Sequence, residues 1–296
     1  MREKHVENEH ITQKKGKRGR RIALEPLLIC LVIVGLAGVV VNARRLPVSV
    51  SLPAVSPESR SSAGVPQTQP APESVAQPEP TAPPEDPAIA ALRDKKLVAL
   101  TFDDGPHHEL TPRLLDFLRE QGVHATFFVI GCNAEAAPEV PGRAAAEGHQ
   151  VASHTYGHKN LTKLGPERLF EEIEKAAALI ESLTGYRPTA LRPPFGEFNS
   201  DVQAAAGVPL LLWSVDPKDW ASRDADKTFR HVMEKAGDGE IILLHDYYEE
   251  SIEAAKRIVL ALKEQGYTFV TIDELLAVRG GAAPGEEVRR RPPLSP

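Results

Sequence analysis

Cysteine is nearly absent from this chain of 296 residues, which has only two. Cys30 lies in an apolar segment near the N-terminus and Cys132 in a more polar, globular part, so we do not expect them to pair. The low count excludes a disulfide framework and leaves the redox compartment undefined. Because no base lies beside Cys132 in the sequence, its expected role is packing rather than nucleophilic attack.

Charged residues are absent from residues 27–41, a run of fifteen predominantly apolar residues. Residues 22–24 extend this apolar run toward the N-terminus. A membrane-spanning helix needs about 20 apolar residues, with a lower limit near 17, so the run suffices only with its flank. Basic residues gather at 14–21 and few follow the run, which predicts a cytoplasmic N-terminus and an outside C-terminus. We therefore expect a basic cytoplasmic segment at 1–21 and a membrane anchor at 22–43, with the protein in the cell membrane.

Two alternatives to this anchor exist. Val-Asn-Ala at 41–43 is an acceptable signal-peptide cleavage site, and cleavage there would make the protein secreted. The basic block is also a pattern of nucleic-acid binding, but the adjacent apolar run argues against it, so no nucleic-acid partner is expected.

Apolar periodicity is absent from residues 47–87, which are rich in proline, serine, alanine, glutamine and glutamate. Such a composition cannot bury enough apolar surface to offset the entropy of ordering, which predicts a disordered linker at 44–90. The tail at 280–296 is charged and rich in glycine and proline, and we expect it to be disordered as well. We find no convincing internal repeat.

The remaining residues, 91–279, alternate short apolar runs with amphipathic patterns, which predicts an α/β fold with about seven parallel strands covered by helices. Expected strands are 97–102, 125–130, 150–153, 189–191, 210–215, 241–244 and 268–272, and expected helices are 111–121, 134–147, 166–183, 200–206, 224–236, 251–265 and 273–278. Polar residues cluster where the strands end, which favours a barrel with its site at that edge over an open doubly wound sheet.

Two segments supply a metal site and a base. Residues 101–106 read Thr-Phe-Asp-Asp-Gly-Pro, and His154 and His158 lie four apart about fifty residues later. One carboxylate with two imidazoles suits a divalent metal that keeps positions open for water and substrate. The second carboxylate is then available to deprotonate the metal-bound water, so the pattern indicates a hydrolase.

Five motifs in order resemble those of the polysaccharide deacetylases, the family 4 carbohydrate esterases with a NodB-homology domain. The motifs lie at 101–106, 154–158, 192–196, 216–220 and 243–246. The resemblance spans nearly the whole globular part and implies an irregular (β/α) barrel, in agreement with the alternation of elements.

The resemblance implies a metal site formed by Asp104, His154 and His158, holding zinc, cobalt or another divalent ion. Asp103 would be the general base. Arg192 would pair with Asp103 and orient it.

Further roles follow from the same resemblance. The peptide N–H of Phe195 would bind the oxyanion, where the family often has tyrosine. His245 would protonate the leaving amine and Asp219 would hydrogen-bond His245. Trp220 would line the pocket wall, and Leu243 would lie beneath the acetyl methyl group.

Two neighbouring residues are less clearly assigned. Asp216 precedes a proline and is equally a turn cap or a site residue. Trp213 lies in an apolar run and is expected in the core.

The sequence thus predicts a metal-dependent enzyme that removes N-acetyl groups from an extracellular polysaccharide and releases acetate. Peptidoglycan amino sugars are the first expected substrate; chitin oligosaccharides and acetylxylan are alternatives, as is a catalytically silent glycan-binding module. The expected partners are the N-acetylated glycan and the membrane, with no obligate protein partner.

Overall fold

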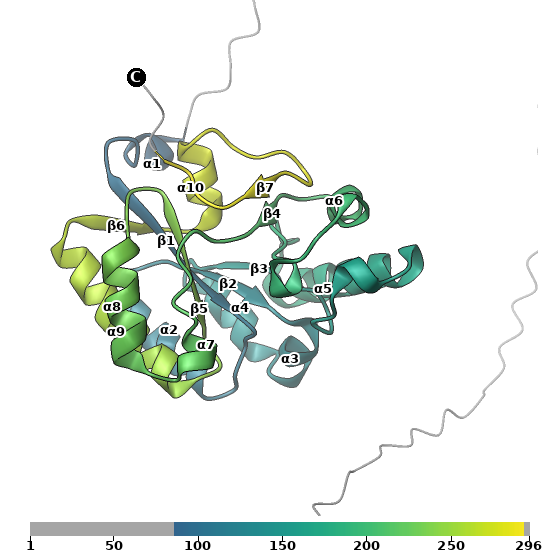
Figure 1. Cartoon of the computed structure of the whole chain (residues 1–296), viewed down its shortest axis with the longest axis horizontal. Coiled ribbons are helices and arrows are strands. Elements are labelled where there is room, and N and C mark those ends of the chain that lie inside the picture. Colours follow the sequence, from purple (N-terminus) through teal and green to yellow (C-terminus); the bar gives the residue numbers. More distant parts are fainter. Residues whose placement is uncertain (1–85, 293–296) are drawn as a thin grey trace, which may run out of the picture. The chain divides into compact units, whose positions relative to one another are not determined.

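The computed structural model describes residues 86–292 (Figure 1). The strands are β1 (Lys96–Asp103), β2 (Thr126–Val129), β3 (Gln150–Ser153), β4 (Leu210–Leu211), β5 (Glu240–His245), β6 (Tyr267–Val270) and β7 (Glu287–Val288). The helices are α1 (Pro87–Ala90), α2 (Leu110–Gln121), α3 (Gly131–Ala136), α4 (Glu139–Ala146), α5 (Pro166–Thr184), α6 (Ser200–Ala206), α7 (Asp219–Ser222), α8 (Ala225–Lys235), α9 (Glu249–Glu264) and α10 (Ile272–Val278).

Strand β1 is the centre of a five-stranded parallel sheet. It pairs with β5 along nearly its whole length, and its other edge pairs with β6 along the first half and with β2 along the last residues. β3 continues the sheet beyond β2. The predicted α/β fold with a parallel sheet is confirmed.

Single-residue bridges continue the pairing beyond β3. Leu191 pairs with both Ser153 and Leu210, and Val215 pairs with Ile242 of β5. The paired segments therefore lead from β1 through β2 and β3 round to β5, which gives a closed but irregular arrangement.

Two predicted strands are much shorter than expected. At 189–191 only the bridge at Leu191 forms, and 210–215 contains the two residues of β4 and the bridge at Val215. β4 begins at the predicted residue, and its pairing is lost over 212–214 before it resumes at Val215.

The side chains of β1 alternate between two apolar clusters, as the pleat of a strand requires. Leu100 and Phe102 pack with residues of α2 and α9, whereas Leu97 and Ala99 pack with residues of α10. All four are fully buried. Burial of each large apolar side chain stabilises the fold by about 1.5–3 kcal/mol, so β1 is fixed from both faces.

The helices form two groups. α8 and α9 pack together and α2 contacts α9, while α3 and α4 both contact α5 (Figure 1). The helix predicted at 134–147 is divided into α3 and α4 at Ala137 and Pro138. Gly122 and Gly185 end α2 and α5 with positive φ values of 61° and 84°, a conformation that glycine adopts without steric cost.

The predicted disorder at the two ends of the domain needs correction. In the tail predicted at 280–296, β7 pairs in parallel with β4, and Leu210 N donates to Glu286 O at 2.8 Å. Residues of the tail thus form backbone hydrogen bonds with the two-residue strand β4. Composition does not reveal this pairing, because it depends on the tertiary structure. Within the linker predicted at 44–90, the last residues form α1 with Asp86 as its N-cap.

No helix within residues 86–292 combines the length and apolar character that crossing a membrane requires. The basic segment predicted at 1–21, the anchor at 22–43 and most of the linker lie outside the described residues.

Candidate active site

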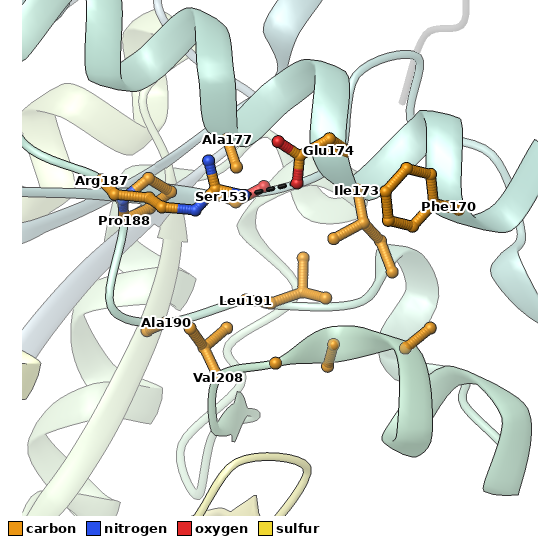
Figure 2. Close-up of a pocket in the computed structure, with 13 residues that line it drawn as sticks. Ser153, Phe170, Ile173, Glu174, Ala177, Arg187, Pro188, Ala190, Leu191 and Val208 are labelled. Atoms are coloured by element: carbon orange, nitrogen blue, oxygen red, sulfur yellow. Dashed lines mark hydrogen bonds and ion pairs between the residues drawn. The ribbon is translucent and has the colours of Figure 1, made fainter. Parts of the chain in front are cut away.

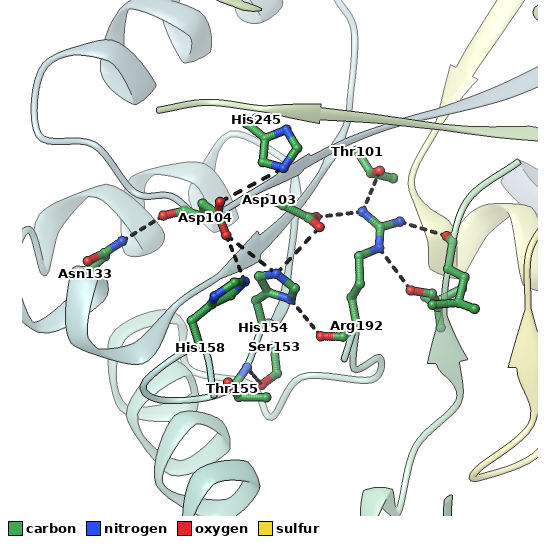
Figure 3. Close-up of polar contacts among 12 residues, drawn as sticks. Thr101, Asp103, Asp104, Asn133, Ser153, His154, Thr155, His158, Arg192 and His245 are labelled. Carbon is green, nitrogen blue, oxygen red and sulfur yellow. Dashed lines mark hydrogen bonds and ion pairs between the residues drawn. The ribbon is translucent and has the colours of Figure 1, made fainter. Parts of the chain in front are cut away.

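The paired segments deliver polar side chains to one edge of the sheet. Asp103 and His245 are the last residues of β1 and β5 and are register partners. His154 directly follows β3, and Arg192 directly follows the bridge residue Leu191. Because neighbouring parallel strands end together, residues far apart in the sequence meet at this edge (Figure 3).

Asp104, His154 and His158 form a cluster suited to a metal ion, as predicted. One potential ligand atom from each residue lies within 4.8 Å of the others. Asp104 Oδ1 is 3.6 Å from His154 Nε2 and 3.4 Å from His158 Nε2. Ligand atoms around a tetrahedral zinc ion are about 3.4 Å apart, given bonds of about 2.1 Å. The spacing of the cluster therefore fits a metal of this size.

The hydrogen bonds of the cluster also fit a metal. His154 Nδ1 lies 2.7 Å from the carbonyl oxygen of Arg192, so Nδ1 carries the proton and Nε2 keeps its lone pair toward Asp104. Asp104 Oδ1 is buried and has no hydrogen-bond partner among the described residues. Burial, together with the nearby His154, lowers the pKa of His158 and favours its neutral, ligating form.

Asp103 and Arg192 form a buried ion pair. Arg192 Nη1 donates to Asp103 Oδ1 at 2.6 Å, and the two side chains are 0% and 4% exposed. The guanidinium is held by three further acceptors: Thr101 Oγ1 at 2.8 Å and the carbonyl oxygens of Leu211 and Leu212 at 2.9 and 3.0 Å. Burial lowers the pKa of Arg192, and Asp103 opposes that effect. Asp103 Oδ2 remains directed at the metal cluster, 3.7 Å from His154 Nε2.

His245 lies beside Asp104 (Figure 3). Asp219 fixes the His245 ring. Asp219 Oδ1 is 2.9 Å from His245 Nδ1, and its Oδ2 accepts from His245 N at 2.9 Å and from Ser251 Oγ at 2.6 Å. Burial lowers the pKa of His245, but the hydrogen bond and charge of Asp219 outweigh it and raise that pKa to about 9. The imidazole is therefore protonated at neutral pH, with Nε2 4.0 Å from Asp104 Oδ2.

The carboxylates and imidazoles of Asp103, Asp104, His154, His158 and His245 face a cavity of about 340 Å³. Phe195, Trp220 and Leu243 line it, as predicted. Trp213, expected in the core, packs against the core but also lines the cavity. Asp216 caps the turn, since its Oδ1 accepts from Lys218 N at 2.8 Å, and it also lines the cavity.

Four residues near the metal cluster were not predicted. Thr101 and Ser251 support Arg192 and Asp219, and Tyr248 lines the cavity beside His245. Asn133 Nδ2 donates to the carbonyl oxygen of Asp104 at 2.7 Å (Figure 3). Thr101 and Tyr248 lie within or next to the motifs and could have been found, whereas Asn133 and Ser251 act only through tertiary proximity.

Four non-glycine residues around the cavity have a left-handed backbone. The φ values are 70° for Asp104, 66° for Thr155, 50° for His158 and 63° for Phe195. Such conformations cost of order 1–3 kcal/mol each and cluster at functional sites. Their concentration in the segments that carry the predicted metal and oxyanion residues supports a role for this edge in chemistry.

A second cavity, of about 150 Å³, lies between α5 and the segment after α6 (Figure 2). Its lining is largely apolar, and its charged groups Glu174 and Arg187 pair with each other. None of the predicted site residues line it.

Comparisons with known proteins agree with the fold. The family model described as polysaccharide deacetylase matches residues 91–209. Peptidoglycan-N-acetylmuramic acid deacetylase PdaC of Bacillus subtilis is 40% identical over 63% of this chain, and the match spans 40% of that protein's length. The solved structure of PdaC superposes with a TM-score of 0.62 over 63% of this chain and 92% of the solved chain.

Two further relatives extend this comparison. A peptidoglycan-N-acetylglucosamine deacetylase of Bacillus cereus is 38% identical over 64% of this chain and 71% of its own length. A family 4 acetyl xylan esterase of Clostridium thermocellum, solved with a cobalt ion, is 32% identical with a TM-score of 0.63, over 67% of this chain and all of the solved chain. The chain belongs to the polysaccharide deacetylase family, the carbohydrate esterases of family 4.

Proposed function

We propose that this chain is a metal-dependent deacetylase that hydrolyses the N-acetyl groups of peptidoglycan amino sugars and releases acetate. The observation that carries the proposal is the pairing of a base and an acid around one metal cluster. Asp103 is held by Arg192, and His245 is held by Asp219.

Asp104, His154 and His158 would hold the divalent metal. Such an ion, when bound, lowers the pKa of a coordinated water toward about 7 and polarises a carbonyl oxygen. Asp103 accepts the proton of the attacking water through Oδ2, because Oδ1 is occupied by Arg192. This hydrogen bond keeps the carboxylate oriented toward the cavity.

Attack of the water oxygen on the acetamide carbon forms a C–O bond and moves negative charge onto the carbonyl oxygen. The peptide N–H of Phe195 would bind this oxygen; a backbone donor is unaffected by phenylalanine in place of tyrosine. His245 then donates its proton to the leaving nitrogen as the C–N bond breaks, which yields acetate and a free amino sugar. An acid with a pKa near 9 is protonated over the physiological range and suits a poor leaving group such as an amine.

Zinc or cobalt fits the cluster, because one carboxylate and two imidazoles bind either ion. The proposal of an outside location rests on the anchor at 22–43 and the linker at 44–90, which would hold the domain near a cell-wall polysaccharide. The named activities of the two Bacillus relatives support peptidoglycan as the substrate, and the relative from C. thermocellum keeps acetylxylan as an alternative.

One experiment tests the function. The chain is stripped of metal, reloaded with zinc and incubated with peptidoglycan, chitin oligomers and acetylxylan, and acetate and the deacetylated sugar are identified by mass. Asp103→Asn should abolish release, and Asp201→Asn, at an exposed position in the first turn of α6, should not. Acetate release that persists after chelation or in Asp103→Asn refutes the mechanism. Glycan binding without release by the fully metallated chain would instead indicate a silent module.

A further inference from the structure

The two histidines of the metal cluster are held in different ways. His154 is buried, and its Nδ1 donates to the carbonyl oxygen of Arg192 at 2.7 Å. The polar and ring contacts of the His158 imidazole within residues 86–292 are of another kind. Its Nε2 lies 3.4 Å from Asp104 Oδ1 (Figure 3), and its ring packs on those of His154 and Phe195. A metal-binding histidine is usually oriented by a hydrogen bond from the nitrogen that does not face the metal. Because His158 has no such bond within these residues, its position depends on the backbone that carries it.

The backbone of residues 154–158, here called the histidine loop, has an unusual conformation. Thr155 and His158 have positive φ values of 66° and 50°. Residues with a side chain rarely adopt this left-handed conformation, and it persists only where neighbouring groups hold it. If that support is lost, the backbone of His158 can return to a more favourable conformation and carry the ring away from Asp104.

One side of the histidine loop is held by the start of α3. Gly131 N donates to Thr155 O and Cys132 N donates to Tyr156 O, both at 2.9 Å. The first N–H groups of a helix have no partner within the helix, so these two bonds also satisfy α3. They hold the loop at residues 155 and 156, before His158.

The other side of the histidine loop is held by Glu172 of α5. Its carbonyl oxygen accepts from Tyr156 N at 3.0 Å, and its Oε2 accepts from Gly157 N at 2.7 Å. Its Oε1 pairs with Lys159 Nζ at 2.6 Å. Gly157 and Lys159 are the chain neighbours of His158, so the Glu172 carboxylate contacts the chain immediately before and after this histidine.

The surroundings of Glu172 indicate that this contact is its function. The residue is 5% exposed, and the other buried residues of α5 are all apolar: Leu169, Ile173, Ala176, Ala177 and Ile180. A buried carboxylate is costly to desolvate unless donors compensate it. An apolar side chain at position 172 would avoid that cost, but it could not accept from Gly157 N. Hydrogen bonds to a charged acceptor are about twice as strong as neutral ones, which suits Glu172 to hold a strained loop.

We propose that Glu172 is a positioning residue of the metal site, which holds the histidine loop in the conformation that directs His158 Nε2 at Asp104. This inference rests on the metal site of the proposed function. Loss of the carboxylate should weaken metal binding through His158, because His154 is oriented by its own hydrogen bond to Arg192.

Competition titration of the metal-stripped full chain with zinc measures the effect. Glu172→Ala removes the acceptor for Gly157 N, so zinc affinity should fall about 10- to 100-fold, as is typical when a group that orients a metal ligand is lost. The visible absorption spectrum of the cobalt-loaded chain should also change, because His158 no longer binds in the same geometry. Glu171→Ala is the matched control, since Glu171 is the exposed neighbour on the same helix, and it should keep the wild-type affinity and spectrum.

Two conservative variants separate the reach of the side chain from its charge. Glu172→Gln can still accept from Gly157 N, and the exposed Lys159 can turn to water, so zinc affinity should stay within about threefold of the wild type. Glu172→Asp keeps the charge but is one methylene shorter, so it should weaken zinc binding at least about fivefold. Circular dichroism verifies that each variant is folded. A purely structural or electrostatic role would not place the glutamine variant above the aspartate variant.

Wild-type zinc affinity in Glu172→Ala overturns the proposal. If the alanine variant does not fold, Glu172→Asp decides, and zinc binding by it that equals or exceeds that of Glu172→Gln overturns the proposal. If the expected order of affinities is found but the wild type releases no acetate from any glycan, the proposed function fails and the role of Glu172 stands. If the wild type binds no zinc, both are overturned.

Discussion

Replacement of Arg192 by methionine tests whether its ion pair with Asp103 stabilises the fold in addition to orienting Asp103. The guanidinium is fully buried and donates to Asp103, Thr101, Leu211 and Leu212. Methionine fills similar space without any donor. The variant leaves a carboxylate buried without its partner, which costs about 3–5 kcal/mol, and two carbonyl groups lose a donor. A domain is stable by only about 5–15 kcal/mol, so the loss is a large fraction of the total.

Urea denaturation of the purified chain measures the effect. With a slope of about 2–3 kcal/mol per molar, the midpoint should fall by about 1.5 M in Arg192→Met. Arg192→Lys keeps the charge but not the forked donors, and it should fall between the wild type and Arg192→Met. This milder variant keeps the test informative if the methionine variant does not fold.

The double variant of Asp103→Asn and Arg192→Met separates the interaction energy of the pair from the contacts that each residue makes elsewhere. Asp103→Asn removes the charge that Arg192→Met leaves unpaired, so the double variant should be more stable than the sum of the two single effects predicts. Additivity within about 0.5 kcal/mol would mean that the two side chains do not interact energetically. A loss below about 1 kcal/mol in Arg192→Met would likewise refute the reasoning.

Three further predictions concern the acid, the metal and the pH dependence of stability. Asp219→Asn removes the negative charge that helps to raise the pKa of His245 to about 9, so the alkaline limb of the kcat/KM profile should shift to lower pH. An unchanged limb would exclude His245 as the acid. Asp104→Asn should lower zinc affinity at least about tenfold by metal-competition titration, and an unchanged affinity would remove Asp104 from the ligand set. Burial lowers the pKa of His149 to about 4, so below pH 6.5 the unfolded chain binds more protons and stability should fall by up to about 3 kcal/mol between pH 6.5 and 4. His149→Asn, which can still accept from Ala125 N, should flatten this fall in urea denaturation, and a variant with the wild-type slope would contradict the assignment. The titratable groups that act on His149 are His124, Glu147 and Arg143.

The parallel sheet was predictable because its central strands are nearly continuous apolar runs. The strand predicted at 150–153 matches β3, and those at 97–102 and 241–244 differ from β1 and β5 by one residue at each end. Such strands are buried on both faces, so their apolar character marks them directly. Weak pairing at 189–191 and the pairing of β7 depend on distant partners, which local composition does not specify.

The candidate site was predictable to a similar extent, for a related reason. Asp103, His154 and Arg192 each follow an apolar run within a motif, so their meeting at one sheet edge follows from the parallel arrangement. Asn133 lies 29 residues from Asp104, whose backbone carbonyl it holds, and nothing around it in the sequence marks that contact. Supporting residues of this kind are defined by the folded structure alone.

The register of β1 and β5 has a consequence for how this fold diversifies. Asp103 and His245 are direct partners across two neighbouring strands, so the spacing of the sheet sets the separation of their backbones. Lengthening or exchanging a surface loop leaves that separation unchanged. A change in the loops around the cavity would therefore alter what the cavity admits, while Asp103 and His245, the proposed proton acceptor and proton donor, keep their relative positions.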